Sequence, residues 1–309
     1  MKLLDFFHRR KTFPHGIHPN EHKELTAGLQ IRRIPFAPDL YVPLAQHIGA
    51  PARPIVKVGQ EVVRGEPIAE ASGFVSVPMH APVTGRVTAI DHLIPSAAGP
   101  KVPAIVIHTY EADTQRVGWE METPTDALTP GELASKVQEA GMVGLGGAAF
   151  PSHVKLLPPE GKRIDTVIIN GCECEPYLTC DHRIMLEQTD RLLAGIEMVL
   201  QATGAGRAII GVEDNKLDAV TQIRDKLPPD GRVTCEAVQS KYPQGAEKML
   251  ITALLDREVP SGGIPADIGV AVYNVGTMAQ LGDLVPRGRG LIDRVVTVTG
   301  PAVGKPGNY

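Results

Sequence analysis

The pattern of hydrophobic residues changes near Thr129, and this change divides the chain into two kinds of structure. Between residues 34 and about 110, short alternating apolar runs are interrupted by glycine and proline, for example at residues 55–58, 74–77, 85–90 and 104–107. Runs of this kind are typical of strands joined by tight turns. The sequence therefore predicts a small all-β unit before Thr129.

From residue 129 onward, helical patterns alternate with buried strands. Residues 131–140 and about 182–203 predict helices, and residues 165–170 predict a strand between them. The same alternation continues with a strand at 207–212, a helix at 215–227 and a strand at 269–275. Strands that alternate with helices indicate an α/β layer whose sheet is at least partly parallel.

Charge and hydropathy argue against two classes of protein. The 309 residues include 31 basic and 35 acidic side chains, which give a formal net charge of −4, and no block of five basic residues occurs. We therefore expect no binding of nucleic acid. The apolar runs are far shorter than the roughly 18 residues needed to cross a bilayer, so no transmembrane segment of its own is expected. The first eleven residues do not form a secretory signal, and the chain is predicted to stay in the cytoplasm.

Glycines recur at successive turns of the predicted β unit. Gly59, Gly65 and Gly85 lie at turns between short strands, a spacing that resembles the biotinyl/lipoyl carrier fold, a flattened sandwich. A working carrier bears its swinging arm on a lysine at an exposed hairpin tip, whereas residues 71–78 contain no lysine. We therefore expect a barrel-sandwich hybrid module that serves for docking rather than as a carrier.

The densest run of glycine lies at residues 144–147, with Phe150 and Lys155 just beyond it. Glycines let the backbone approach a ligand closely and direct successive N–H groups at a phosphate. A dinucleotide fingerprint requires a preceding strand, but a predicted helix precedes this run, and no P-loop lysine motif follows it. A structural glycine turn and a phosphate site are both compatible with the run. The neighbouring aromatic ring and cation favour a nucleotide or a flavin.

A segment with three cysteines follows the strand predicted at residues 165–170. It lies at the carboxyl end of that strand, where α/β proteins bind ligands. The spacing of Cys172, Cys174 and Cys180 matches neither paired zinc motifs nor ferredoxin cluster motifs, so no metal site is predicted in this chain. The alternative is that Glu173 and Glu175 accept hydrogen bonds from a ribose or a nicotinamide amide, while the reduced cysteines pack.

Two later segments place polar groups at the ends of predicted elements. Residues 241–248 bring Gly245 and Glu247 to the start of a helix, and residues 272–277 end a strand with Asn274 and Thr277. Taken singly, each segment is ordinary turn and cap chemistry. Their functional interpretation depends on the combination with the glycine run and the cysteine segment.

The four segments in this order resemble the C subunit of the Rnf-type electron transport complex. The resemblance covers essentially the whole chain, and it is most specific at residues 13–26, 170–183 and 241–248. The α/β part is similar, more distantly, to the flavoprotein subunit of respiratory complex I, whose fold binds FMN and NADH. The fold class implied is a barrel-sandwich hybrid module followed by a complex I flavoprotein-like α/β domain.

The resemblance also implies a cofactor site. A bound flavin would accept hydride from NADH and release electrons singly, so no side chain is expected to be catalytic. Gly144, Gly146, Gly147 and Lys155 would hold the FMN phosphate and the surroundings of its ring. The residues expected to face the flavin are Asn170, Glu173, Gly245, Asn274 and Thr277. Those expected to line the nicotinamide nucleotide are Phe150, Glu175 and Glu247.

A place in a larger assembly is implied as well. The chain would be a peripheral electron-entry component on the cytoplasmic side of the cell inner membrane, with the other proteins of the complex as partners and ferredoxin as an indirect one. The two ferredoxin-type cysteine runs of the family do not occur in this sequence, so [4Fe-4S] clusters are expected only in a C-terminal continuation. A flavin-free scaffold and a soluble NADH diaphorase subunit are the alternatives.

Four parts are therefore expected along the chain. They are an N-terminal arm at residues 1–32, the barrel-sandwich hybrid at 33–110, the FMN- and NADH-binding α/β domain at 111–290, and the start of a β-grasp-like unit of the SLBB type at 291–309. The last part begins with the β run at 294–299 and stops soon after it. We therefore expect the chain to be a fragment of a longer protein.

Overall fold

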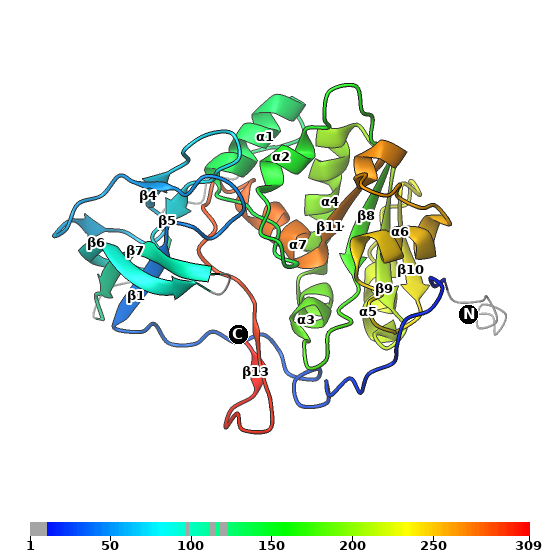
Figure 1. Cartoon of the computed structure of the whole chain (residues 1–309), viewed down its shortest axis with the longest axis horizontal. Helices are drawn as coiled ribbons and strands as arrows, with labels where there is room; N and C mark the ends of the chain where they lie inside the picture. Colours follow the sequence, from blue (N-terminus) through cyan, green and yellow to red (C-terminus); the bar gives the residue numbers. More distant parts are fainter. Residues whose placement is uncertain (1–10, 97–98, 112–114, 118–122) are drawn as a thin grey trace.

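The computed structural model describes residues 11–96, 99–111, 115–117 and 123–309 (Figure 1). The first ten residues of the predicted arm lie outside this description. A β-rich module stands beside a larger α/β body in Figure 1, and each of the two has its own hydrophobic core. No helix among the described residues is long and apolar enough to cross a membrane.

The module consists of two small sheets. In the first, β1 (Asp39–Pro43), β7 (Gly99–Thr109), β6 (Gly85–Ser96) and β3 (Glu61–Val62) pair in that order, each antiparallel to its neighbour. The second contains β2 (Arg53–Pro54), β4 (Pro67–Glu70) and β5 (Met79–His80). Buried aliphatic side chains from both sheets, such as Ile68 and Ile105, form one core. The predicted all-β unit is confirmed, although β6 and β7, with 12 and 11 residues, are longer than the predicted runs.

Two runs in the module that were predicted as strands are not strands. Residues 55–58 and 74–77 are irregular instead, with a turn that begins at Val58 and a bend at Phe74 and Val75. Val56 and Val77 are buried, but Val58 and Phe74 are both 60% exposed, and neither run pairs as a strand among the described residues. The carbonyl oxygen of Phe74 lies 2.6 Å from Nε2 of His153 in the α/β body, which replaces a strand partner.

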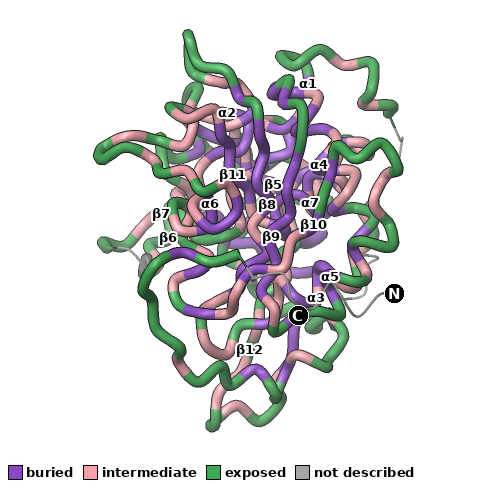
Figure 2. The backbone as a smooth tube through the Cα atoms, turned by 90° about the vertical axis from the view of Figure 1, so that its right-hand side faces the viewer, coloured by how far each residue is buried: buried purple, intermediate pink, exposed green. Residues whose placement is uncertain are grey.

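The alternating pattern predicted a sheet that is at least partly parallel, and the sheet of the α/β body is parallel throughout. Its strands are β8 (Thr166–Gly171), β9 (Arg207–Glu213), β10 (Val233–Val238) and β11 (Val270–Asn274), in the order β10-β9-β8-β11. Both faces are covered by helices. Side chains on both sides of each strand are therefore buried, which explains why the strand sequences are continuous apolar runs. Figure 2 shows the strands as the buried centre of the body.

The helices cover the sheet unequally. Helix α6 (Glu247–Leu255) packs on one face through Leu250, Ile251 and Leu254. The other face is covered by α3 (Cys180–Glu187), α4 (Thr189–Thr203), α5 (Leu217–Arg224) and α7 (Val275–Leu284), with α1 (Pro130–Glu139) and α2 (Ser152–Leu156) outside them. A short 3-10 helix, η2 (Pro265–Ile268), precedes β11.

The single helix predicted at residues 182–203 was wrong, because the segment forms two helices. Gln188 separates α3 from α4 and has a backbone conformation of φ −126° and ψ 29°, outside the helical region. The bend lets α3 pack against α5 while α4 packs against α7. The apolar period continues across the bend, so the periodicity alone could not locate it.

Helices α4 and α7 approach each other at two glycines. A Cβ atom built on Gly195 would lie 2.0 Å from the carbonyl oxygen of Met278, and one built on Gly282 would lie 2.0 Å from that of Arg191. No side chain can occupy either position without moving a backbone. The close contact positions the first turn of α7, which lies beside the glycine run.

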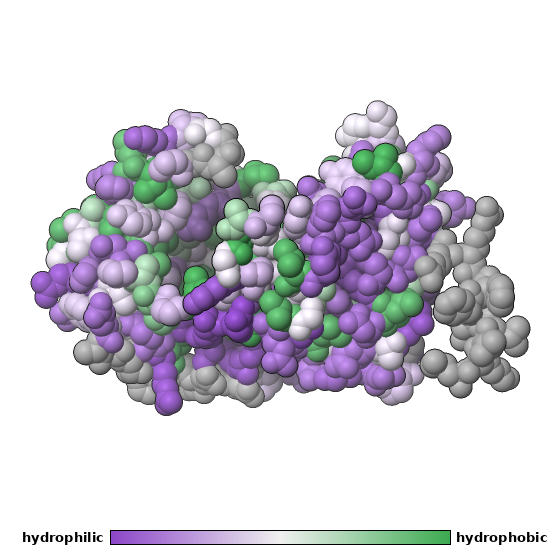
Figure 3. All heavy atoms as spheres, turned by 90° about the horizontal axis from the view of Figure 1, so that it is seen from below, coloured by the Kyte–Doolittle hydropathy of each residue, from purple (hydrophilic) through white to green (hydrophobic). Residues whose placement is uncertain are grey.

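The N-terminal arm follows the lower edge of the α/β body in Figure 1, where the parallel strands end. It makes backbone bridges from Lys11 to Val238, from Ile17 to Tyr242 and from Ile31 to Asn308. Near its end the chain forms a short antiparallel pair, β12 (Thr297–Val298) with β13 (Gly307–Asn308), beside the arm. The surface seen from below is mostly hydrophilic, with small separated apolar patches (Figure 3).

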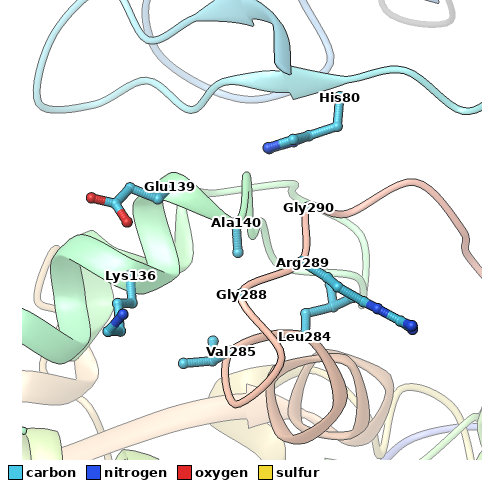
Figure 4. A pocket seen from close by; sticks show the side chains of 9 residues that line it. All are labelled: His80, Lys136, Glu139, Ala140, Leu284, Val285, Gly288, Arg289 and Gly290. Atoms are coloured by element: carbon cyan, nitrogen blue, oxygen red, sulfur yellow. The ribbon is translucent and has the colours of Figure 1, made fainter. Parts of the chain in front are cut away.

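A small cavity of about 70 Å³ lies between the module and the α/β body. His80 of β5 reaches across it towards Ala140 and Gly290 (Figure 4). A Cβ atom on Gly290 would lie 2.1 Å from Cγ of His80, so the imidazole packs directly on backbone. Burial lowers the pKa of His80 from 6.5 to about 4.

We expect the stability of the protein to fall as the pH drops from about 6.5 towards 4, in part because of His80. The unfolded chain binds a proton in this range while the folded chain does not, which costs up to about 1.4 kcal/mol per pH unit. Urea unfolding of wild type and His80→Gln at pH 7.5 and pH 5 measures the effect. The variant should lose less stability than wild type, whereas exposed His92→Gln should behave as wild type. If wild type and both variants lost the same stability between pH 7.5 and pH 5, His80 would not be a source of the pH dependence.

Candidate functional site

The glycine run lies against the first turn of α7. The N–H of Leu145 donates to Oγ1 of Thr277 over 2.9 Å, and the N–H of Gly144 donates to the carbonyl oxygen of Phe150 over 2.9 Å. A Cβ atom on Gly146 would lie 2.9 Å from Cβ of Asn274. Four residues predicted for the flavin site are thus brought together here, and Gly146 is needed for the close approach.

Three consecutive backbone donors in this loop are unused. Among the described residues, the N–H groups of Gly146, Gly147 and Ala148 donate no hydrogen bond, and all three residues are exposed. Gly147 has a φ of 145°, and a Cβ atom there would meet nothing within 4 Å. Free, exposed donors beside a helix N-terminus suit an anionic group such as a phosphate.

Asn274 is the N-cap of α7 and links the helix to α3. Its Oδ1 accepts hydrogen bonds from the N–H groups of Gly276 and Thr277, at 2.9 and 3.2 Å. Its Nδ2 donates to Oδ2 of Asp181 over 2.6 Å. Burial and the neighbouring carboxylate of Glu173 raise the pKa of Asp181 to about 7. Asn274 therefore organises this corner of the sheet edge through its own polar atoms.

Asn170 and Gly245 join the end of β8 to the loop before α6. Nδ2 of Asn170 donates to the carbonyl oxygen of Gly245 over 2.8 Å, and its Oδ1 accepts from the N–H of Cys172 over 3.0 Å. A Cβ atom on Gly245 would lie 2.5 Å from the carbonyl oxygen of Cys172. Only glycine permits the two loops to meet this closely.

The two glutamates of the cysteine segment have different environments. Glu173 is 5% exposed, and its Oε1 accepts hydrogen bonds from the N–H of Asp181 at 2.9 Å and from Sγ of Cys180 at 3.3 Å. Its carboxylate therefore stabilises the N-terminus of α3. Glu175, two residues later, is exposed. The structure places only Glu175 with its carboxylate accessible to a ligand.

One group of possible metal ligands lies in this segment. Glu173, Cys180 and Asp181 each offer one ligand atom, and these atoms lie within 4.8 Å of one another. Hydrogen bonds to the start of α3 and to Asn274 already occupy the carboxylates of this group. Burial raises the pKa of the Cys180 thiol to about 12, so the sulfur is a neutral thiol rather than a thiolate ligand.

Lys155 and Glu247 lie together beside β11. Nζ of Lys155 donates to the carbonyl oxygen of Val272 over 2.6 Å and lies 3.7 Å from Oε2 of Glu247. Burial lowers the pKa of Lys155. Phe150, which is half-buried, precedes α2 in the same segment as Lys155. The ammonium of Lys155 is thus committed to the backbone of β11 rather than free at the glycine loop.

Two buried lysines near the site were not predicted from the sequence. Nζ of Lys23, in the arm, donates to the carbonyl oxygens of Glu173, Glu175 and Leu178 at 2.8, 3.0 and 2.5 Å. Lys241 donates to the carbonyl oxygens of Phe13 and His15. Both lysines are less than 10% exposed. Both lie in segments that carry the family resemblance, residues 13–26 and 241–248, but the carbonyl groups that they bind are distant in the sequence.

The loop before α6 also contains a buried amide without a partner. Neither Nε2 nor Oε1 of Gln244 makes a hydrogen bond among the described residues, although the side chain is fully buried. Buried polar groups are normally paired, so this amide is an exception among the described residues. The free N–H groups of the glycine loop are exposed, and they fit the phosphate of a cofactor such as FMN.

Two family models match the chain in succession. Residues 11–112 match the model described as the RnfC barrel sandwich hybrid domain. Residues 137–283 match the model described as the Nuo51 FMN-binding domain. The predicted fold class, a barrel-sandwich hybrid followed by an FMN-binding α/β domain, is confirmed.

Curated relatives are similar over almost the whole chain. It is 43% identical over 298 residues to the C subunit of the "Proton-translocating ferredoxin:NAD(+) oxidoreductase complex" of Clostridium ljungdahlii, covering 96% of this chain and 65% of that protein. It is 43% identical over 295 residues to the C subunit of the "Na(+)-translocating ferredoxin:NAD(+) oxidoreductase complex" of Acetobacterium woodii, covering 96% and 66%. The chain thus spans slightly less than two thirds of the length of these relatives.

A solved structure is similar to part of the chain. A chain of the NAD+-reducing [NiFe]-hydrogenase in the air-oxidized state matches with a TM-score of 0.50 and 25% identity, covering 58% of this chain and 36% of that chain. The α/β architecture described above therefore recurs in an enzyme that reduces NAD+.

Proposed function

Because this chain is a homologue of the C subunits of the Rnf-type ion-translocating oxidoreductases, we propose that it binds FMN and forms the site where NADH is oxidised. The observation that carries the proposal is the exposed glycine loop, whose three free N–H groups lie beside the N-terminus of α7. This loop lies within the segment that matches the FMN-binding domain. Backbone donors can hold an anionic cofactor without a basic surface, which agrees with the net charge of −4.

We assign the predicted residues to this site as follows. Gly144, Gly146 and Gly147 form the phosphate loop, which Thr277 holds in place through the N–H of Leu145. Asn170 and Gly245 join the two loops that border the flavin ring, and Asn274 closes the corner between α3 and α7. Glu173 holds the start of α3, and Lys155 holds the segment after the glycine loop against β11. The bound flavin supplies the change from two-electron to one-electron transfer.

The nicotinamide nucleotide would lie on the side of Phe150, Glu175 and Glu247. Glu175 is exposed, and Glu247 is partly exposed at the first residue of α6. Phe150 offers an apolar ring next to the glycine loop. Two accessible carboxylates and an aromatic ring suit the hydroxyl groups and the base of a nucleotide.

We expect Glu247→Ala to weaken NADH binding by about tenfold, because a hydrogen bond from the nucleotide to a carboxylate is lost. FMN affinity should change by less than twofold. Titration of the FMN-loaded chain with NADH, followed by flavin fluorescence, measures both effects. Glu258→Ala, at an exposed position beyond the other end of α6, should change neither affinity. Equal losses of NADH and FMN affinity would refute the role of Glu247.

The decisive experiment is a titration of the 309-residue chain with FMN, followed by addition of NADH without oxygen. We expect flavin fluorescence to be quenched on binding and flavin absorbance to bleach with NADH. Binding without bleaching would retain the FMN site and reject the nucleotide assignments. A folded chain that binds no FMN would overturn the proposal in favour of a scaffold role.

The place of the chain in a complex is part of the proposal. The relatives are named as subunits of ferredoxin:NAD(+) oxidoreductase complexes. We propose that this chain docks at the cytoplasmic side of the inner membrane, and that electrons continue towards ferredoxin through [4Fe-4S] clusters held outside these 309 residues. The boundaries expected after residues 32, 110 and 290 remain part of this proposal.

A further inference from the structure

Arg294 reaches the glycine loop from outside the segment that matches the FMN-binding domain. That segment ends at residue 283, and Arg294 lies in the chain between α7 and β12. Its Nη2 donates to the carbonyl oxygen of Leu145 over 2.7 Å. Leu145 directly precedes Gly146, the first residue with a free N–H. The guanidinium therefore lies beside the unused backbone donors.

The remaining donors of Arg294 are available. The bond to Leu145 is the only hydrogen bond of its guanidinium among the described residues, and the side chain is exposed. A guanidinium has five N–H donors, so four remain for a ligand. Lys155, the other cation near this loop, is already bound to Val272 and Glu247. Arg294 is thus the cation that the loop can offer to an anion.

A second interaction locates Arg294 near the N-terminus of α7. The side chain lies close enough to Asp181 for its positive charge to lower the pKa of that carboxyl, against the larger opposite effects of burial and Glu173. Asp181 is in turn bound to Asn274, the N-cap of α7. Arg294 therefore lies over the corner where the glycine loop and the N-terminus of α7 meet.

We propose that Arg294 binds the phosphate of FMN together with the N–H groups of Gly146 and Gly147. This inference rests on the proposed function. A guanidinium presents paired donors that match two phosphate oxygens, whereas the backbone groups alone carry only partial charge. The bond to Leu145 holds the side chain at the loop before the ligand arrives. The chemical class recognised is a phosphomonoester dianion, the group that distinguishes FMN from riboflavin.

The test compares FMN with riboflavin on the complete 309-residue chain. Arg294→Gln should raise the Kd of FMN by about 10- to 100-fold, the effect of losing hydrogen bonds to a charged group. The Kd of riboflavin, which has no phosphate, should change by less than about threefold, since Arg294 would contribute nothing to its binding. Arg294→Lys keeps the charge but not the paired donors, and we expect an intermediate Kd for FMN.

Arg33→Gln is the matched control. Arg33 is also exposed, and it pairs with Asp293, the neighbour of Arg294, over 3.4 Å. It should leave both affinities unchanged. An unchanged FMN affinity in Arg294→Gln, or parallel losses for FMN and riboflavin, would overturn the inference while the proposed function stands. A wild-type chain that binds no FMN would overturn the proposed function itself.

Discussion

Replacing Lys216 by methionine is expected to lower the free energy of unfolding by about 3–5 kcal/mol, the usual cost of leaving a buried charge without its partner. Nζ of Lys216 lies 2.8 Å from Oε2 of Glu213, and both side chains are only 1% exposed. The variant removes the ammonium and leaves the carboxylate of Glu213 in the interior. Urea unfolding followed by circular dichroism measures the loss.

A second ion pair of the same length provides the control. Lys226 and Asp190 are also 2.8 Å apart, but their side chains are 37% and 81% exposed. Lys226→Met should cost less than about 1 kcal/mol, because solvent screens an exposed pair. The double variant Glu213→Gln/Lys216→Met should recover part of the loss by removing the stranded charge. Similar losses in Lys216→Met and Lys226→Met would contradict the argument.

The loss in Lys216→Met should also depend on pH. Burial raises the pKa of Glu213 above its ordinary value of 4.5 even with Lys216 present, and removal of the lysine raises it further. A carboxyl whose pKa is higher in the folded state binds more protons there, so stability decreases as the pH rises through this range. We therefore expect the loss to be smaller at pH 5 than at pH 8.

The second large effect is expected at Gly195, where α4 meets α7. Gly195→Ala should cost about 3 kcal/mol, because overpacking against an unyielding backbone forces the helices apart. The new Cβ atom would lie 2.0 Å from the carbonyl oxygen of Met278. Since α7 also carries Asn274 and Thr277, FMN affinity should fall with stability.

Gly131→Ala is the matched control for this substitution. Gly131 is also in a helix, α1, and a Cβ atom there would meet nothing within 4 Å. Alanine is the better helix former by about 1 kcal/mol, so this variant should be neutral or more stable than wild type. If both alanine variants retained wild-type stability, the close packing of α4 on α7 would not limit stability as described.

The alternation of strands and helices was predictable because each element of the α/β body has a strong apolar pattern of its own. The break at Gln188 was not, since it depends on how α3 and α4 pack against different neighbours rather than on their periodicity. The run at residues 74–77 likewise depends on a distant partner, because His153 contacts the carbonyl oxygen of Phe74. Local patterns do not encode contacts of this kind.

In the candidate site too, local motifs were predictable and long-range contacts were not. The glycine run and the ends of β8 and β11 could be found from local motifs, although the roles of their residues remain predictions. Glu173 and Glu175 look equivalent in the sequence, yet only Glu173 is placed to stabilise α3. Lys23 and Arg294 are single cations whose partners lie more than a hundred residues away. Only the folded chain shows where they point.

The N-terminal arm links the module to the rim of the candidate site. Lys23 ties the arm to the loop at residues 173–178, and Thr26 bonds to Thr179, which bonds in turn to Asn308 near the other end of the chain. From these anchors the arm continues directly into β1 of the module. The chain therefore enters the module from the rim of the candidate site, in addition to the contacts that His80 and Phe74 make with the α/β body. Any pull on the module by a docked partner acts on that rim as well.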